Sequence, residues 1–200
     1  MKLHHSPASP YVRKVMACAI ARGLEGRIET LATNPHVSPP GLLADNPLSK
    51  VPALVTDEGL ALFDSPVICE YLDGLGEAPK LFPAAGPARI AALRLQAVAD
   101  GMLDAAVGRR GMQALPQDEG RLAYDARQQA AVERSLALLE REAGALGGAL
   151  TIGSVAVGCA LGYLDFRFAG EPWRERHPRL AVWFEEMSKQ PALARTVPVG

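Results

Sequence analysis

Asp64, Ser65 and Pro66 stand side by side, and their types suit the two charged ends of a small ligand. A serine followed by a proline is typical of a helix start, with the serine as N-cap and the proline as first helical residue. Apolar residues at helical spacing over 67–75 continue this helix. Its N-terminus favours a carboxylate and Asp64 favours an ammonium group. The pattern predicts a site for an α-amino acid end-group, with an ordinary capped helix as the alternative.

The dipeptide Val51-Pro52 precedes a strand candidate at residues 53–56. Proline lacks a backbone N–H and favours an extended conformation in the residue before it, so the backbone of Val51 stays free for other partners. Residues 57–59 supply a turn and residues 60–63 return as a second strand. The sequence therefore predicts a hairpin of about four residues on each side, directly before the helix at Ser65.

Two serines, Ser6 and Ser9, follow a short strand candidate at residues 2–5. Ser9 and Pro10 repeat the signal of a cap followed by proline, and apolar residues at helical spacing continue until Gly23 ends the helix. The hydroxyl of Ser9 thus lies at the start of a helix, with Ser6 on the loop before it.

Two stretches of the chain resemble a known family. Residues 50–54, Lys-Val-Pro-Ala-Leu, followed by a hairpin and by Asp64-Ser65, resemble the glutathione-binding half of the cytosolic glutathione transferases. Residues 6–15, Ser-Pro-Ala-Ser-Pro-Tyr-Val-Arg-Lys-Val, resemble the first loop and helix of the serine-type or cysteine-type bacterial members. The likeness is strongest in these two stretches and extends more loosely over the whole chain.

The resemblance implies a role in glutathione binding for each matched residue. In this family the peptide bond between Val51 and Pro52 is cis, and the backbone of Val51 pairs with the cysteinyl unit like an added strand. Lys50 meets the glycyl carboxylate, and Asp64 and Ser65 hold the γ-glutamyl end. Glutathione is then a co-substrate, and no metal is required.

The resemblance also implies that a hydroxyl at the start of the first helix faces the sulfur of glutathione. Ser9 matches that position, and Ser6 is the other candidate for the hydroxyl that faces the sulfur. The alternative without a catalytic role is that Ser9 serves only as the N-cap of its helix. A free thiol with a pKa of about 8.5 is only about 3% ionised at pH 7, and lowering that pKa by two needs about 2.7 kcal/mol. A charge-assisted hydrogen bond of about 1.5–3 kcal/mol and a helix N-terminus of about 0.3–2 kcal/mol could supply it together. The absence of a cysteine at this position disfavours thiol exchange.

The implied function is a glutathione transferase that directs the thiolate at a small hydrophobic electrophile or a peroxide. The alternative is a binding or regulatory protein that keeps the fold without turnover. The family further implies a homodimer. Asp100 and Asp104 lie on a long helix that lines the dimer interface and the second-substrate pocket in the family, so they are candidates for a cross-subunit or pocket role, with ordinary salt bridges as the alternative.

The order of elements, β-α-β-α-β-β-α, followed only by helices, favours a thioredoxin-like domain joined to an all-α domain. We expect the first domain to span residues 1–76, a linker rich in glycine and proline to span 77–85, and the helical domain to span 86–200. This fold class rests on the resemblance as much as on periodicity, which cannot fix the order of strands in a sheet.

An almost wholly apolar helix beginning near Thr151 is expected at the centre of the second domain. Ser154 stands where the family has an aspartate that reaches back to the cap, and Gly153 replaces an alanine, so we expect a weakened capping box. At the far end of this helix, Asp165 and Arg167 are expected to pair with each other or with the first helix.

Composition limits the remaining classes of function. The 200 residues carry 21 basic and 22 acidic side chains, a net charge of −1 that favours neither nucleic acid nor an anionic membrane surface. Three cysteines, without metal-ligand spacing, are expected to be buried thiols of a reducing compartment. The first ten residues lack the apolar region of a signal peptide, and the longest apolar run is too short and too polar to span a membrane. We therefore expect a cytoplasmic protein.

Overall fold

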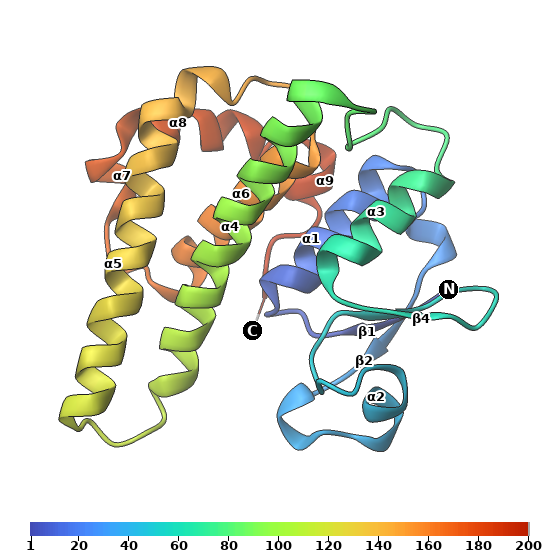
Figure 1. Ribbon diagram of the computed structural model, residues 1–200, viewed down its shortest axis with the longest axis horizontal. Coiled ribbons are helices and arrows are strands. Elements are labelled where there is room, and N and C mark those ends of the chain that lie inside the picture. Colours follow the sequence, from blue (N-terminus) through green and yellow to red (C-terminus); the bar gives the residue numbers. More distant parts are fainter. Residues whose placement is uncertain (200) are drawn as a thin grey trace.

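The computed structural model describes residues 1–199 and has two parts, a four-stranded sheet with helices on both faces and a set of helices packed beside it (Figure 1). This is a thioredoxin-like domain followed by an all-α domain, which confirms the predicted fold class. Within the described residues, no helix has both the length and the apolar character needed to cross a membrane.

The sheet contains β1 (Lys2–His5), β2 (Glu29–Ala32), β3 (Ala53–Val55) and β4 (Ala61–Leu62) in the order β2-β1-β3-β4. β1 and β2 are parallel, and the other two pairs are antiparallel. The hairpin strands are shorter than predicted. The reason is that the Leu60 N–H donates to the hydroxyl of Thr56 at 3.1 Å instead of to its carbonyl, so the regular ladder ends there.

Three helices cover the sheet: α1 (Pro10–Ala21) and α3 (Ser65–Leu75) on one face, and α2 (Pro40–Asp45) on the other (Figure 1). The start of α3 differs from the prediction by one residue. Asp64 is the N-cap, because the Ile68 N–H donates to the Asp64 carbonyl at 3.1 Å, and Ser65 and Pro66 are the first helical residues. The Ser65 hydroxyl is thereby freed from a capping role.

The second part consists of α4 (Gly86–Met112), α5 (Glu119–Glu142), α6 (Ile152–Arg167), α7 (Trp173–Arg176), α8 (Pro178–Met187) and α9 (Pro191–Ala194). Helix α6 is buried from Ile152 to Leu164 and packs against α4 on one side and α1 on the other. The apolar sequence predicts burial at the centre of the second part, and the structure adds that α6 joins the cores of the two parts.

At the start of α6 both hydrogen bonds of the capping box are formed, and whether the box is weakened stays a prediction. The Thr151 hydroxyl accepts from the Ser154 N–H at 3.2 Å, and the Ser154 hydroxyl accepts from the Thr151 N–H at 2.8 Å, so the box is complete. A serine oxygen can take the place of a carboxylate as acceptor, although a neutral acceptor forms the weaker bond. A Cβ atom at Gly153 would lie only 2.7 Å from the Ala92 carbonyl oxygen, so glycine is what permits α6 to approach α4.

The far end of α6 also differs from the prediction. Asp165 accepts hydrogen bonds from Trp173 at 2.8 Å and from Arg174 at 2.6 Å, both on α7, instead of pairing with Arg167 or α1. The guanidinium of Arg167 lies 3.9 Å from the centre of the Phe166 ring. The partners of Asp165 lie on the next helix, and the apolar periodicity of α6 could not predict them.

The segment between α3 and α4 is fixed to both parts of the chain. Asp73, near the end of α3, accepts from the N–H groups of Leu81 at 2.7 Å and Phe82 at 3.3 Å, and the Leu81 carbonyl accepts from the Ile152 N–H at 2.9 Å. Arg22 at the end of α1 lies 3.3 Å from the same Asp73 carboxylate. The assignment of residues 77–85 as a linker stays a prediction. Within this stretch, Leu81 and Phe82 are held by hydrogen bonds to Asp73.

The three cysteines are free thiols, and all are fully buried, as predicted. They come from α1, α3 and α6. A hydrogen bond with Cys69, together with burial, raises the pKa of Cys18, and burial raises the pKa of Cys159 to about 11. Cys18 and Cys159 are therefore neutral, and all three cysteines belong to the core cluster that contains residues of both parts.

Candidate functional site

The predicted site residues come from three separate segments that the strand register brings to one edge of the sheet. β1 and β3 are antiparallel, and continuing their register past the strand ends places Ser6 opposite Val51. β3 and β4 are also antiparallel, and the same continuation places Val51 opposite Ser65. The first turns of α1 and α3 and the loop before β3 therefore meet at this edge.

Ser9 is the N-cap of α1, and its hydroxyl oxygen accepts a hydrogen bond from the Val12 N–H at 3.3 Å. The Ser9 N–H donates to the Ser6 carbonyl at 3.1 Å, so the loop that joins the two serines is a closed turn. A serine hydroxyl has one hydrogen to donate besides its acceptor lone pairs. The capping role is therefore present, and it leaves the hydroxyl hydrogen of Ser9 available to a ligand.

Val51 has the backbone geometry that the resemblance implies. The bond between Val51 and Pro52 is cis, and the residue is 9% exposed. Among residues 1–199, neither the N–H nor the carbonyl of Val51 has a hydrogen-bond partner. Buried backbone groups are nearly always paired, so an unpaired N–H and carbonyl on one residue mark a place where an extended ligand backbone can bind.

The start of α3 presents further unpaired polar groups. Asp64 is exposed, Ser65 is 1% exposed, and neither side chain forms a hydrogen bond within the described part of the chain. The peptide bond between Phe63 and Asp64 is also cis. Lys50 is exposed, without a carboxylate within 4 Å among residues 1–199. A carboxylate, a hydroxyl and an ammonium group are thus all open to a ligand at the same edge.

Asp100 and Asp104 face α1 of the same chain. Asp100 forms an ion pair with Lys14, with Nζ at 2.6 and 2.7 Å from the two carboxylate oxygens, and the Tyr11 hydroxyl donates to Asp104. For Asp100 this is the salt-bridge alternative that the sequence left open. Burial raises the pKa of Asp100 against the lowering effect of Lys14, and Asp64 is among the charges that raise it further.

Three residues that sequence reasoning did not single out contribute to this region: Tyr11, Lys14 and Asn46. Lys14 is fully buried on an otherwise apolar face of α1. A charged residue at such a position of the helical pattern is the signal that could have identified it. Burial and the bond to Asp104 raise the pKa of Tyr11, so its hydroxyl stays a neutral donor. Asn46 is 2% exposed and bonds the loop before Val51.

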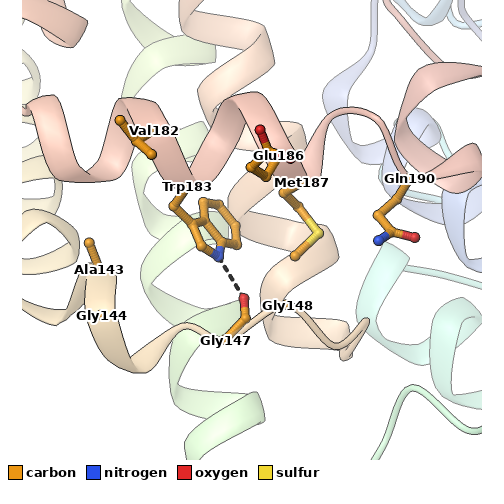
Figure 2. A pocket seen from close by; sticks show the side chains of 9 residues that line it. All are labelled: Ala143, Gly144, Gly147, Gly148, Val182, Trp183, Glu186, Met187 and Gln190. Carbon is orange, nitrogen blue, oxygen red and sulfur yellow. Dashed lines mark hydrogen bonds between the residues drawn. The ribbon is translucent and has the colours of Figure 1, made fainter.

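A separate hollow of about 400 Å³ lies between the turn after α5 and α8 (Figure 2). Its wall includes Trp183, whose indole N–H donates to the Gly147 carbonyl at 2.9 Å, together with Met187 and Glu186. None of the predicted site residues lines it. This hollow is therefore distinct from the edge of the sheet where the polar groups gather.

Comparisons with known proteins identify the family of the chain. Two family models match the chain, the glutathione S-transferase N-terminal domain over residues 8–75 and the C-terminal domain over residues 96–186. The chain is 34% identical over 204 residues to the uncharacterized GST-like protein YibF of Escherichia coli K12, covering 99% of this chain and 98% of YibF.

Two crystal structures of a glutathione transferase family member from Pseudomonas fluorescens Pf-5 are also similar. One contains bound glutathione, is 41% identical, has a TM-score of 0.94, and is matched over 100% of this chain and 99% of its own. The other contains bound S-(propanoic acid)-glutathione, is 40% identical with a TM-score of 0.89, and is matched over 100% of both chains. With both family models matched in order and relatives matched from end to end, the chain belongs to the glutathione S-transferase family.

Proposed function

We propose that this protein is a glutathione transferase of the serine type, which activates the thiol of glutathione for attack on a small hydrophobic electrophile or a peroxide. The observation that carries the proposal is the set of unpaired polar groups at one edge of the sheet: the Val51 backbone, the Asp64 carboxylate and the Ser65 hydroxyl. The backbone of the cysteinyl unit of glutathione can pair with the backbone of Val51. The γ-glutamyl ammonium group is complementary to the Asp64 carboxylate, and the γ-glutamyl carboxylate is complementary to the Ser65 hydroxyl. Lys50 takes the glycyl carboxylate. Glutathione bound in the relative at 41% identity supports the same ligand here.

In this proposal the hydroxyl of Ser9 donates its free hydrogen to the glutathione sulfur and so favours the thiolate, while its oxygen keeps the cap on Val12. The thiol proton passes to solvent. With a carbon electrophile, the thiolate forms a carbon–sulfur bond and the leaving group departs with the bonding electron pair, or the electrons move onto an activated double bond. The S-(propanoic acid)-glutathione bound in the relative at 40% identity is a thioether of this kind and supports conjugation as the reaction class.

The binding part of the proposal is tested at the start of α3. Ser65→Ala and Asp64→Ala should each weaken glutathione binding about tenfold or more, since each removes a bond to a charged group worth about 1.5–3 kcal/mol. Neither side chain forms a bond within the described residues, so the free energy of unfolding should change little. Calorimetric titration with glutathione gives the affinity, and urea denaturation gives the stability.

Ser135→Ala is the matched control, because it removes a hydroxyl that bonds only to the Ala131 carbonyl of its own helix, at 2.9 Å. Its affinity for glutathione should equal that of the wild type. Unchanged affinity in both the Ser65 and the Asp64 variants would refute the site assignment.

We also propose that the protein is a homodimer. Large apolar side chains are exposed on the segments that carry the proposed glutathione site, among them Leu48 at 61%, in the loop before Val51, and Val67 at 47%, in the first turn of α3. Exposed apolar residues gathered near one site favour an interface with another chain. Light scattering at micromolar concentration should give about twice the chain mass of 21.2 kDa, and Leu48→Glu should give the single mass.

Leu122→Glu serves as the control for this experiment, since Leu122 is 56% exposed but lies on α5, in the other part of the chain. It should leave the mass unchanged. A wild-type particle of 21.2 kDa would rule out the dimer.

The second candidate, a glutathione-binding protein without turnover, would share the contacts of Val51, Asp64 and Ser65. It differs from the enzyme in one respect, because it needs no stabilised thiolate. The wild-type protein should therefore be tested for glutathione binding and for turnover on a broad panel of electrophiles and peroxides. Binding together with turnover supports the transferase, whereas binding with neither a thiolate nor turnover would replace it by the non-catalytic role.

A further inference from the structure

Asn46 closes the loop that leads into Val51. Its side-chain oxygen accepts from the Leu48 N–H at 3.0 Å, and its side-chain nitrogen donates to the Lys50 carbonyl at 2.9 Å. Its backbone carbonyl accepts from the Ser49 N–H at 3.0 Å, and its own N–H donates to Leu42 at 2.7 Å. The residue is 2% exposed. Asn46 therefore fixes both ends of the segment 47–50 from a buried position.

The bond from Asn46 to the Lys50 carbonyl has a consequence for the next residue. The peptide between Lys50 and Val51 is trans, and in a planar trans peptide the C=O and the N–H point in opposite directions. Because the carbonyl is directed toward the buried Asn46, the N–H of Val51 is directed away from it. That N–H has no partner among residues 1–199.

We propose that Asn46 is a positioning residue, which orients the Lys50–Val51 peptide so that the Val51 N–H faces glutathione. The inference rests on the proposed function, since it assumes that an extended thiol peptide binds along Val51. Asn46 itself does not touch the ligand. It acts by fixing the direction of one backbone donor before the ligand arrives, and preorganisation of this kind lowers the free energy spent in ordering the site on binding.

The residue beside Asn46 anchors this loop on the sheet. Asp45 accepts from Nε2 of His4 at 2.9 Å, and Nδ1 of His4 lies 2.9 Å from the hydroxyl of Thr33. His4 is on β1, the strand that pairs with β3, and is 6% exposed. The end of α2 is thus joined by side-chain bonds to the sheet on which Val51 must be positioned.

If Asn46 only stabilised the loop, the conservative variant Asn46→Asp should bind glutathione differently from what the positioning role predicts. Aspartate keeps an oxygen that can accept from the Leu48 N–H, so Asn46→Asp preserves the side-chain turn that starts the loop. It replaces the donor to the Lys50 carbonyl by a carboxylate oxygen, which repels that carbonyl. If Asn46 only stabilised the loop, Asn46→Asp would bind glutathione as the wild type does.

The test is calorimetric titration of Asn46→Asp, Asn46→Ala and the wild type with glutathione, alongside steady-state kinetics on any electrophile that the wild type turns over. Both variants should bind glutathione about tenfold more weakly, because the Lys50–Val51 peptide loses the hydrogen bond that fixes its orientation. The kcat at saturating glutathione should stay unchanged. In amide NMR spectra, the Val51 resonance should shift on addition of glutathione in the wild type and not in Asn46→Asp at the same concentration.

Ser49→Ala is the control in the same loop. The Ser49 hydroxyl bonds to Ser38 at 2.8 Å and to the Pro35 carbonyl at 3.3 Å, and neither bond involves the Lys50–Val51 peptide. Its affinity should match the wild type, and an equal loss in Ser49→Ala would overturn the inference in favour of general loosening of the loop. Wild-type affinity in Asn46→Asp would also overturn it and leave the proposed function intact, whereas a wild type that does not bind glutathione would refute the proposed function itself.

Discussion

Replacing Ser9 with alanine should raise the pKa of bound glutathione by about 1–2, because the proposed charge-assisted hydrogen bond of about 1.5–3 kcal/mol is lost at 1.36 kcal/mol for each pKa unit. In the proposed role the Ser9 hydroxyl stabilises only the ionised sulfur, so the affinity for glutathione should change little. At pH 7 the conjugation rate should fall about tenfold or more, in proportion to the lost thiolate. The thiolate is followed by its ultraviolet absorbance across a pH titration.

The variant also removes the N-cap of α1, which costs about 1 kcal/mol of stability, and this effect must be separated from chemistry. Ser9→Gly makes the separation, because a glycine cap is only a few tenths of a kcal/mol worse than serine and has no hydroxyl. It should show the raised pKa with near wild-type stability. Ser6→Ala should do less than either variant. If Ser6→Ala changes the pKa and the rate while both Ser9 variants leave them alone, the two serines have been assigned in the wrong order.

Replacing Lys14 with methionine should lower the free energy of unfolding by about 3 kcal/mol. Lys14 is fully buried and Asp100 is 20% exposed, and removing one member of a buried ion pair leaves the other charge without compensation. The pair joins α1 to α4, so the loss falls on the contact between the two parts of the chain. Urea denaturation at pH 7 measures it, and a loss below about 1 kcal/mol would contradict this reading of the pair.

The pH dependence of Lys14→Met gives the prediction a second readout. Burial already raises the pKa of Asp100, and Lys14 is the main opposing influence. Without Lys14 the folded-state pKa rises further above the unfolded value, so the folded variant binds a proton more readily. The loss in free energy of unfolding caused by Lys14→Met should therefore become smaller as the pH falls from 7 toward 4. It should become larger again as the pH rises through the folded-state pKa of Asp100.

The double variant Lys14→Met with Asp100→Leu is the control for both readouts. An apolar pair of similar size in place of a buried ion pair is often neutral or stabilising. The double variant should therefore recover most of the stability lost in Lys14→Met. It should also lose the pH dependence, because no carboxylate remains at position 100.

Local chemistry was predictable from the sequence wherever neighbours along the chain decide it. The helix starts near Ser9 and Ser65 follow from proline geometry and capping, which involve residues no more than four apart. Burial of the three cysteines and of α6 follows from apolar spacing. The cis bond at Val51–Pro52 came from the resemblance, since a proline allows a cis bond without requiring it.

Details of these elements escaped prediction where two chemical groups can satisfy the same backbone atom. The hairpin is short because the Thr56 hydroxyl takes the place of a carbonyl, and the capping box of α6 is complete because the Ser154 hydroxyl takes the place of a carboxylate. Both substitutions depend on side-chain torsions, which the residue types leave open.

By itself the sequence determined which groups the candidate site contains: a serine at each of two helix starts, the acid Asp64, and a valine whose backbone is freed by proline. Only the tertiary structure decided that these groups meet, because the register of β1, β3 and β4, continued past the strand ends, brings Ser6, Val51 and Ser65 to the same end of the sheet. It also decided the pairing of Lys14 with Asp100, and the orientation that Asn46 gives to the Lys50–Val51 peptide. Strand register and contacts between helices depend on the packing of distant segments, and no local pattern along the chain fixes that packing.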